Sequence, residues 1–255
     1  MSNTTTLQDF EQEALRIVNE AQKEGIVLRL MGASAVKMHC IKYKALLEEM
    51  DRALTDLDFM TYRKNSQYLT NLFRRLGYEP NDIFIQMHGH TRHIYMDKLH
   101  RRVADVFFDK LSFCHTIDFQ NRLELDSPTI TLTDILLEKM QIVHINEKDI
   151  KDSIVLLAEH DIGETDRETV DAKHIAELLS NDWGFYYTVQ TNLKRVAGYV
   201  EEKPAWPAEV KETVRNKVET LLNRIESEPK SFRWKMRAKV GTSKIWYNEV
   251  EEVER

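Results

Sequence analysis

The sequence predicts an α+β protein, with a mixed β-sheet flanked by helices in the N-terminal half and a helical C-terminal half. Short apolar or alternating segments lie before about residue 110, whereas helical periodicity dominates after about residue 131. The 255 residues are 42% hydrophobic and contain only 8 glycines and 5 prolines, which excludes a disordered or collagen-like chain. The expected domains are residues 1–130 and 131–255.

The charge and the cysteine content exclude several classes of protein. A formal net charge of −6 argues against a surface that binds nucleic acid throughout. No apolar run approaches the roughly 18 residues that a membrane helix needs, and the first residues lack the basic and apolar regions of a secretory signal. Cys40 and Cys114 are too few for a disulfide framework. We therefore expect a cytoplasmic protein with no membrane partner.

Apolar spacing and glycine positions predict the elements of the N-terminal half. Helical spacing marks two helices, and short apolar or alternating runs mark the strands. In chain order these are a helix over 7–24 that ends at Gly25, a strand over 26–31, a helix-compatible stretch over 33–50, a strand over 55–62, a helix over 64–76 that ends at Gly77, and two antiparallel strands over 94–99 and 103–108.

The C-terminal half is predicted from helical stripes. Thr133 and Asp134 open a helix that is expected to reach Val143, and Asp149 opens another. Apolar residues from 185 to 200 step by three or four positions, and a second such stripe runs from 210 to 225 after Pro207, which fits the first turn of a helix.

Three carboxylates suggest a metal site. Asp56 and Asp58 alternate with Leu57 and Phe59, so the two acids share one face of a strand and repel each other unless a cation holds them. Mg²⁺ is the economical cation, because it takes oxygen ligands and joins one or two carboxylates to substrate phosphates. Asp105, in the strand over 103–108, completes a three-carboxylate site if that strand lies beside the first. Asp109 shares its face and is the alternative third acid.

A phosphate-binding turn is predicted just before these acids. Gly32 stands where a strand gives way to a helix, and its missing Cβ lets a phosphate approach the backbone. The amides that follow and the Ser34 hydroxyl are suitable donors. A phosphate turn together with a metal site indicates metal-assisted phosphoryl or nucleotidyl transfer.

These motifs resemble those of the polymerase-β-like nucleotidyltransferase superfamily. The residues concerned are GAS at 32–34, RALTDLDF at 52–59 and the later strand acid. The closer resemblance is to the branch that includes the toxins of AbiE-type abortive-infection systems, where a Gly-rich turn precedes an Arg-x-x-x-Asp-x-Asp-Phe segment. A later helix with a central Lys and a Lys-Asp…Asp pair is matched by Lys139, Lys148, Asp149 and Asp152. The resemblance covers about residues 26–160.

The resemblance implies roles for seven residues. Asp56 and Asp58 would bind Mg²⁺ (or Mn²⁺) that holds the triphosphate of an NTP, and Asp105 would join the metal that activates the acceptor hydroxyl. The remaining roles fall to Gly32 and Ser34, which would cradle the phosphates, to Lys139, which would reach the triphosphate or ribose, and to Arg52, which would neutralise phosphate or fix its loop. The simpler interpretation of Lys139 is a lysine that extends to solvent beside an apolar stripe.

The expected function is therefore transfer of an NMP from an NTP to a hydroxyl acceptor, which is an RNA, a protein or a small molecule. The resemblance allows a toxin that has an antitoxin partner. Two alternatives stay open, an O-nucleotidyltransferase that modifies an aminoglycoside-like antibiotic in an acidic pocket, and a catalytically degenerate nucleotide-binding protein.

Two further features allow other interpretations. His88, His90, His93 and His100 fall close together, but their spacing is loose for zinc, and a hairpin that faces substrate or solvent is favoured. Residues 230–244 hold six basic residues and no acid, with Trp234 inside and Trp246 just beyond. A solvated basic tail is the favoured interpretation, and contact with RNA is the alternative.

Overall fold

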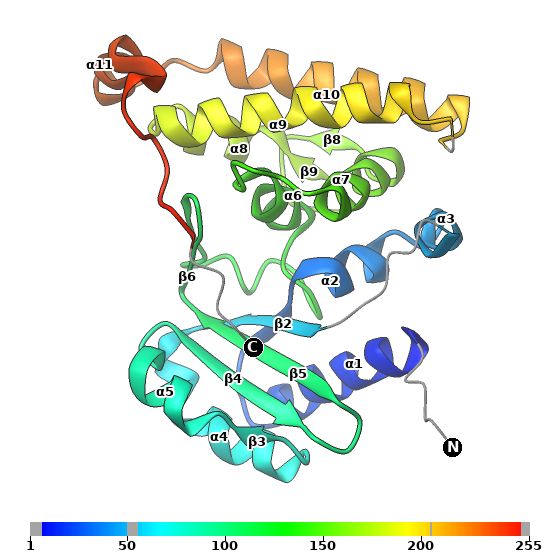
Figure 1. Ribbon diagram of the computed structural model, residues 1–255, viewed down its shortest axis with the longest axis vertical. Helices are drawn as coiled ribbons and strands as arrows, with labels where there is room; N and C mark the ends of the chain where they lie inside the picture. The colour runs from blue at the N-terminus through cyan, green and yellow to red at the C-terminus, as the bar shows by residue number, and fades with distance from the viewer. Residues whose placement is uncertain (1–6, 50–55, 205, 251–255) are drawn as a thin grey trace. The chain divides into compact units, whose positions relative to one another are not determined.

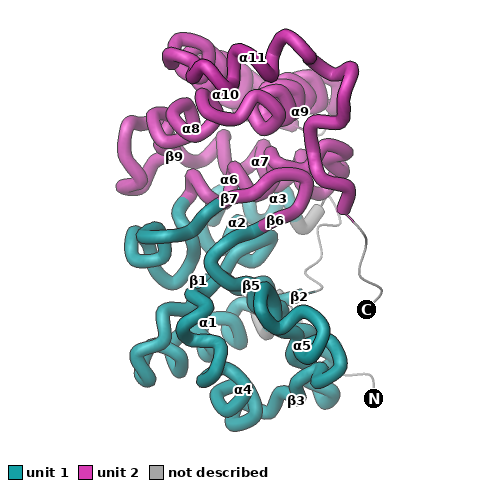
Figure 2. Tube along the Cα trace, turned by 90° about the vertical axis from the view of Figure 1, so that its left-hand side faces the viewer, with its two compact units in different colours: residues 1–111, 118–131 teal, residues 112–117, 132–255 magenta. Residues whose placement is uncertain are grey.

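The chain forms two compact units, shown in Figures 1 and 2. The computed structural model describes residues 7–49, 56–204 and 206–250. Unit 1 comprises residues 1–111 and 118–131, and unit 2 comprises residues 112–117 and 132–255. The short segment 112–117 thus belongs with the C-terminal part of the chain, whereas the expected division after residue 130 put it in the first domain.

Unit 1 contains a five-stranded mixed sheet with helices (Figure 1). Its helices are α1 (Leu7–Lys23), α2 (Gly32–His39), α3 (Lys44–Glu49), α4 (Ser66–Arg75) and α5 (Asp82–His88). Its sheet strands are β1 (Leu28–Leu30), β2 (Asp56–Thr61), β3 (Glu79–Pro80), β4 (Arg92–Asp97) and β5 (Arg102–Phe108). The sheet order is β1-β2-β5-β4-β3, and β2 is parallel to β5 whereas the other neighbours are antiparallel.

Strand alternation gives the sheet an apolar face and a face that carries acids. Leu57 and Phe59 of β2 join Val106 of β5 in a core with apolar residues of α1 and α4. Because side chains alternate along a strand, Asp58 and Asp105 project from the opposite face. The alternation that predicted the carboxylate face is therefore confirmed in both strands.

Most predicted elements of unit 1 are confirmed. The helix before Gly25, the strand before Gly32, the helix before Gly77 and the β4–β5 hairpin all lie where expected. The stretch over 33–50 differs, because α2 ends at His39 and α3 begins at Lys44. The His39 imidazole lies 2.7 Å from the Thr129 hydroxyl, which anchors the end of α2. The short helix α5 was not predicted.

Unit 2 is mainly helical. Its helices are α6 (Leu132–Met140), α7 (Glu147–Glu159), α8 (Ala172–Leu179), α9 (Trp183–Glu202), α10 (Ala208–Ser227) and α11 (Phe232–Val240). Short strands are β6 (Lys110–Ser112) with β7 (Thr116–Asp118), a pair that straddles the unit boundaries, and β8 (Ile162–Gly163) with β9 (Val170–Asp171). Both predicted stripes are buried, from Phe185 to Val200 in α9 and from Val210 to Ile225 in α10.

Two predictions in unit 2 were wrong in detail. The helix that was expected to reach Val143 ends at Met140, because the Asn192 side-chain amide donates to the carbonyls of Met140 and Ile142 at 3.0 and 2.7 Å and satisfies them outside a helix. Pro207 precedes the first turn of α10 as its N-cap. Within the described ranges, we find no helix with the length and apolar character needed to span a bilayer.

Candidate functional site

The turn between β1 and α2 brings Gly32 against Asp58. Gly32 has a φ of +67°, a left-handed conformation that L side chains rarely adopt. A Cβ at this position would lie 2.8 Å from Asp58 Oδ2, which is closer than real Cβ contacts. The Met31 amide donates to the Asp58 carbonyl at 2.8 Å and holds the turn against β2. The turn is buried and packs directly against one predicted carboxylate, and only glycine fits there without displacement.

Asp58 and Asp105 are direct neighbours across the parallel strands. The register pairs Asp58 with Asp105 and Asp56 with Val103. Adjacent strands lie about 4.8 Å apart, so the two acids start from neighbouring backbone positions on one face. The condition set by the sequence, that the strand over 103–108 lies beside 55–60, is met. Asp56 lies one pleat further along the same face.

Asp105 is paired with Arg92, which was not predicted as a site residue. Asp105 is fully buried, and Arg92 of β4 binds it through two hydrogen bonds, one from Nε to Oδ1 at 2.6 Å and one from Nη2 to Oδ2. Arg92 also lies over the rings of Phe84 and Phe107. Burial raises the pKa of the Asp105 carboxyl above its ordinary value, and the Arg92 guanidinium acts in the opposite direction. The carboxylate is thus held in one fixed orientation.

Two buried polar groups of α2 lie after the Gly32 turn. Ser34 is 2% exposed, and its Oγ has no hydrogen-bond partner among the described residues. Buried hydroxyls normally have partners, so this hydroxyl keeps a donor and an acceptor that no described residue uses. Lys37 is 1% exposed and shares a helix face with Ser34 because it lies three residues later. Lys37 was not predicted as a site residue, although a lone lysine inside the apolar run ASAVKMHC was a visible signal.

The described residues contain no group of three or more His, Cys, Asp or Glu that could hold a metal ion. The three-carboxylate metal site with Asp56, Asp58 and Asp105 therefore stays a prediction. The four histidines are likewise not gathered. His88 ends α5, His93 is buried in β4 beside the Tyr95 hydroxyl at 2.9 Å, and His100 lies 2.8 Å from Asp97.

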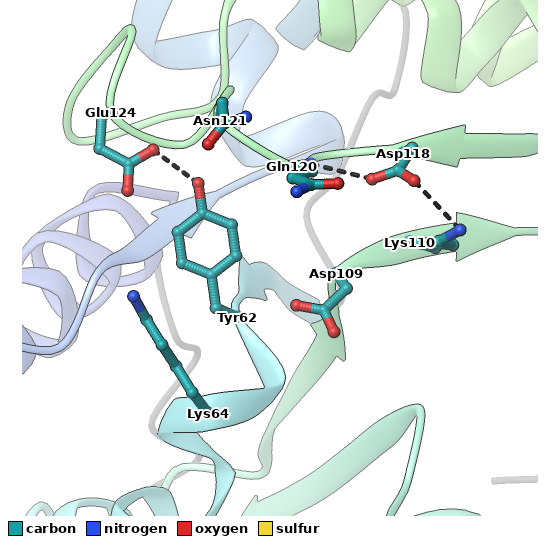
Figure 3. A pocket seen from close by; sticks show the side chains of 8 residues that line it. All are labelled: Tyr62, Lys64, Asp109, Lys110, Asp118, Gln120, Asn121 and Glu124. Atoms are coloured by element: carbon teal, nitrogen blue, oxygen red, sulfur yellow. Dashed lines mark hydrogen bonds and ion pairs between the residues drawn. The ribbon is translucent and has the colours of Figure 1, made fainter.

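A separate cavity of unit 1 lies where β5 ends, and Figure 3 shows its lining. It has a volume of about 490 Å³. Asp109, the alternative third acid, lines it and has a φ of +58°. Its Oδ1 accepts a hydrogen bond from the Arg63 amide at 3.0 Å. The lining residues are Tyr62, Lys64, Asp109, Lys110, Asp118, Gln120, Asn121 and Glu124, and among them the sequence suggested only Asp109, as the alternative third acid.

The polar groups of this cavity are arranged around Tyr62 (Figure 3). The phenol donates to Glu124 at 2.5 Å, and burial together with this carboxylate raises the pKa of Tyr62 to about 12. The Lys64 ammonium lies 5.1 Å from the centre of the same ring. Lys110 and Asp118 form an ion pair at 3.0 Å. Three carboxylates face two ammonium groups, so the cavity suits a polar ligand with hydroxyl or amino groups.

The remaining predicted site residues are Arg52 and Lys139. Arg52 lies outside the described residues. Lys139 belongs to unit 2, where its Nζ lies 2.9 Å from Asp149 and 3.3 Å from Asp152. Burial alone would lower the pKa of Lys139, but these acids and Glu138 more than offset it, so the pKa lies above its ordinary value. The simpler interpretation, a lysine that extends to solvent, is wrong, since Lys139 is 6% exposed.

The chain has a distant similarity to a solved structure. No protein-family model matches the chain, and no curated protein is detectably similar in sequence. Among solved structures, an antigenic nucleotidyltransferase-like protein from Paracoccidioides brasiliensis is similar, with a TM-score of 0.42 and 14% identity over 89% of this chain and 96% of that chain. A likeness at this TM-score and identity does not by itself assign an activity, so the function is inferred from this chain's own residues.

Proposed function

We propose that the protein is a nucleotidyltransferase that moves an NMP from an NTP to a hydroxyl acceptor. The observation that carries the proposal is the meeting of the Gly32 turn with Asp58, which itself lies beside Asp105 in register. A turn that admits phosphate next to a pair of carboxylates is the arrangement that phosphate transfer needs. The unpartnered Ser34 hydroxyl supports the same placement of the phosphates.

Each group then has a role. The backbone of Gly32 and the Ser34 hydroxyl bind the β- and γ-phosphates. Asp105 accepts the proton of the acceptor hydroxyl, and Arg92 holds that carboxylate in position. The acceptor oxygen bonds to the α-phosphorus as the bond to the bridging oxygen breaks, and pyrophosphate leaves. Lys37 is added as a cation near the phosphates, and Arg52 and Lys139 keep their predicted roles as proposals.

The carboxylates present fit Mg²⁺ or Mn²⁺. Asp56 and Asp58 offer hard oxygen ligands beside a phosphate turn, and Mg²⁺ needs only one or two carboxylates when phosphates and water complete its coordination. A bound ion would neutralise charge on the triphosphate. Asp105 would join it only through the lone pairs that its two bonds from Arg92 leave free.

The test is transfer of label from each of the four NTPs, radiolabelled at the α-phosphate, to components of a cell lysate with Mg²⁺. We expect Asp58→Asn to lower labelling on the order of 100-fold, the scale of losing one group that stabilises charge in the transition state. The matched control is Asp82→Asn, which removes an exposed acid of unit 1 at the start of α5. Equal labelling by wild type and Asp58→Asn would reject the proposal.

The same experiment separates the alternatives. An NTP that binds without any transfer in the wild type indicates the catalytically degenerate nucleotide-binding protein. Label on RNA or protein, together with slow growth on expression, supports a toxin with an antitoxin partner.

A second candidate is the antibiotic O-nucleotidyltransferase, which the cavity around Tyr62 favours. That function predicts an acidic acceptor pocket, and Asp109, Asp118 and Glu124 line this cavity. An aminoglycoside carries amines and hydroxyls that suit these carboxylates. Expression should then confer resistance, and Glu124→Gln should weaken it. Resistance that is unaffected by Glu124→Gln would separate this cavity from the acceptor.

A further inference from the structure

Residues 230–244, the basic segment near the C-terminus, form an ordered surface of unit 2. It is centred on α11, drawn in red in Figure 1, which starts with Ser231 as its N-cap and has no buried residue. Its first residues include the exposed Arg233, and a cavity of about 260 Å³ opens beside it. Aromatic, cationic and polar side chains line this cavity, chiefly Trp183, Trp234, Trp246, Arg233, Arg237 and Asp182.

The cations of this surface are largely unneutralised. Residues 230–244 hold six basic residues and no acid in a chain with net charge −6. Across the described residues, Arg233, Lys235 and Lys239 have no carboxylate within ion-pair distance, and all three are exposed. The cavity lining has one acid, Asp182, whose Oδ1 accepts the Phe185 amide at 3.0 Å as the N-cap of α9, against the two guanidinium groups of Arg233 and Arg237. The local field therefore favours an anion.

The aromatic groups are fixed in place. Arg237 lies over the Trp183 ring at 4.8 Å and donates to the Gly241 carbonyl at 2.6 Å. The Trp246 indole donates to the Thr188 hydroxyl at 3.1 Å. Guanidinium planes and indole rings held this way are ready-made platforms for a flat π-system, and they lose little side-chain entropy on binding.

One donor in the cavity lining is unused. The Trp234 Nε1 atom is buried and has no hydrogen-bond partner among the described residues. A buried indole N–H normally finds an acceptor, so this donor is an unused hydrogen-bonding group in a residue that lines the cavity. The cavity volume is below the roughly 300–1,000 Å³ of sites for drug-sized ligands, which suits a single base.

We propose that the surface formed by Arg233, Trp234, Lys235, Arg237 and Trp246 binds single-stranded nucleic acid. A phosphate backbone matches the unpaired cations, and a base matches the cavity lined by indoles and a guanidinium. An acidic peptide would satisfy the charges but would leave the aromatic platforms unused. The proposal does not rest on the transfer reaction, because binding needs no catalytic acid.

The test uses the full chain and a fluorescein-labelled single-stranded RNA of about 15 nucleotides, a length that covers one to a few binding sites. Anisotropy gives the affinity at about 50 and 200 mM salt, where phosphate contacts differ strongly. We expect Arg233→Glu to weaken binding about tenfold and to lower the salt slope by roughly 0.7–1. Lys194→Glu is the matched control, because Lys194 is an exposed lysine of α9 outside this surface.

Tryptophan fluorescence reports the stacking part. RNA, or single-stranded DNA of the same sequence, should quench it, whereas polyglutamate should not. Equal binding by Arg233→Glu and Lys194→Glu would overturn the proposal. Equal affinity for duplex or for polyglutamate, without quenching, would overturn it too. Asp58→Asn should bind as wild type, so loss of transfer with retained binding separates this proposal from the function proposed above.

Discussion

The Gly32 turn leads to a sharp prediction through the substitution Gly32→Ala. The new methyl group would destabilise the protein in two ways. It would strain the backbone at residue 32, and it would clash with the Asp58 side chain. A φ of +67° costs an L residue about 1–2 kcal/mol. The Cβ would also lie 2.8 Å from Asp58 Oδ2. The carboxylate must therefore move until the distance from Cβ to Oδ2 reaches the 3.4 Å of an ordinary van der Waals contact.

A second glycine separates these two effects. Gly25 has a φ of +72° at the end of α1, and a Cβ there would meet nothing within 4 Å. Gly25→Ala therefore carries the strain without the clash. Urea unfolding should show a loss of about 1–2 kcal/mol in the free energy of unfolding for both variants, with the larger loss for Gly32→Ala.

The two variants should differ most in activity. A displacement below 1 Å of a group that holds the phosphates costs up to about 100-fold, so Gly32→Ala should lose roughly tenfold or more of the transfer rate. Gly25→Ala should keep the wild-type rate. Labelling assays with both purified variants measure this difference. If Gly32→Ala transfers as fast as Gly25→Ala, the Asp58 carboxylate does not act at the position inferred from this turn.

Three other substitutions test the contribution of buried titratable side chains to stability. Arg92→Met leaves the buried Asp105 uncompensated and should cost about 3–5 kcal/mol at pH 7 in urea unfolding. The loss should become smaller as pH falls to about 3, below the ordinary aspartate pKa of about 3.9, where the carboxyl becomes protonated. Lys139→Met should cost about 3–5 kcal/mol at pH 7 and progressively less as pH rises above about 10.4, the ordinary pKa of lysine. Because the pKa of Lys139 is raised, its stabilisation is complete below the ordinary pKa and is lost gradually as pH rises toward the raised pKa. The His115 ring lies 2.8 Å from the Thr188 hydroxyl, and burial lowers its pKa to about 4. The folded state therefore holds the ring neutral, and this contribution to the free energy of unfolding is lost as pH falls from about 6.5 to 4. Wild type should lose about 3 kcal/mol more than His115→Gln over that window, and parallel pH profiles would contradict this.

Local patterns predicted the faces of the sheet but not the partners across it. The alternation around Asp58 and the turn at Gly32 are properties of a few neighbouring residues, and both were confirmed. Which strand lies beside β2, and in which register, depends on the path of the chain through the whole sheet. The sequence therefore allowed Asp105 and Asp109 as third acids, and only the register places Asp105 opposite Asp58.

The missed residues share one cause. Arg92 lies thirteen residues before Asp105 in the chain but reaches it across one strand pair. Lys37 is a helical lysine that would ordinarily face solvent, and tertiary packing buries it. Lys139 was predicted as a site residue, but its burial was not predicted. The function of a buried cation depends on which acids surround it, and for Lys139 these include Asp149 and Asp152 of a different helix.

Residues 112–117 belong to unit 2 although they precede the end of unit 1 in the chain, and this limits where the protein can be divided. Within unit 2, the Cys114 carbonyl accepts the Asn248 amide at 2.9 Å, and the His115 ring stacks on Phe185 at 4.8 Å. A gene cut after residue 131 would leave these groups in the first fragment and their partners in the second. Co-expressed halves, or chimaeras that exchange the C-terminal part with a relative, must therefore carry this hexapeptide and its partners as one matched set.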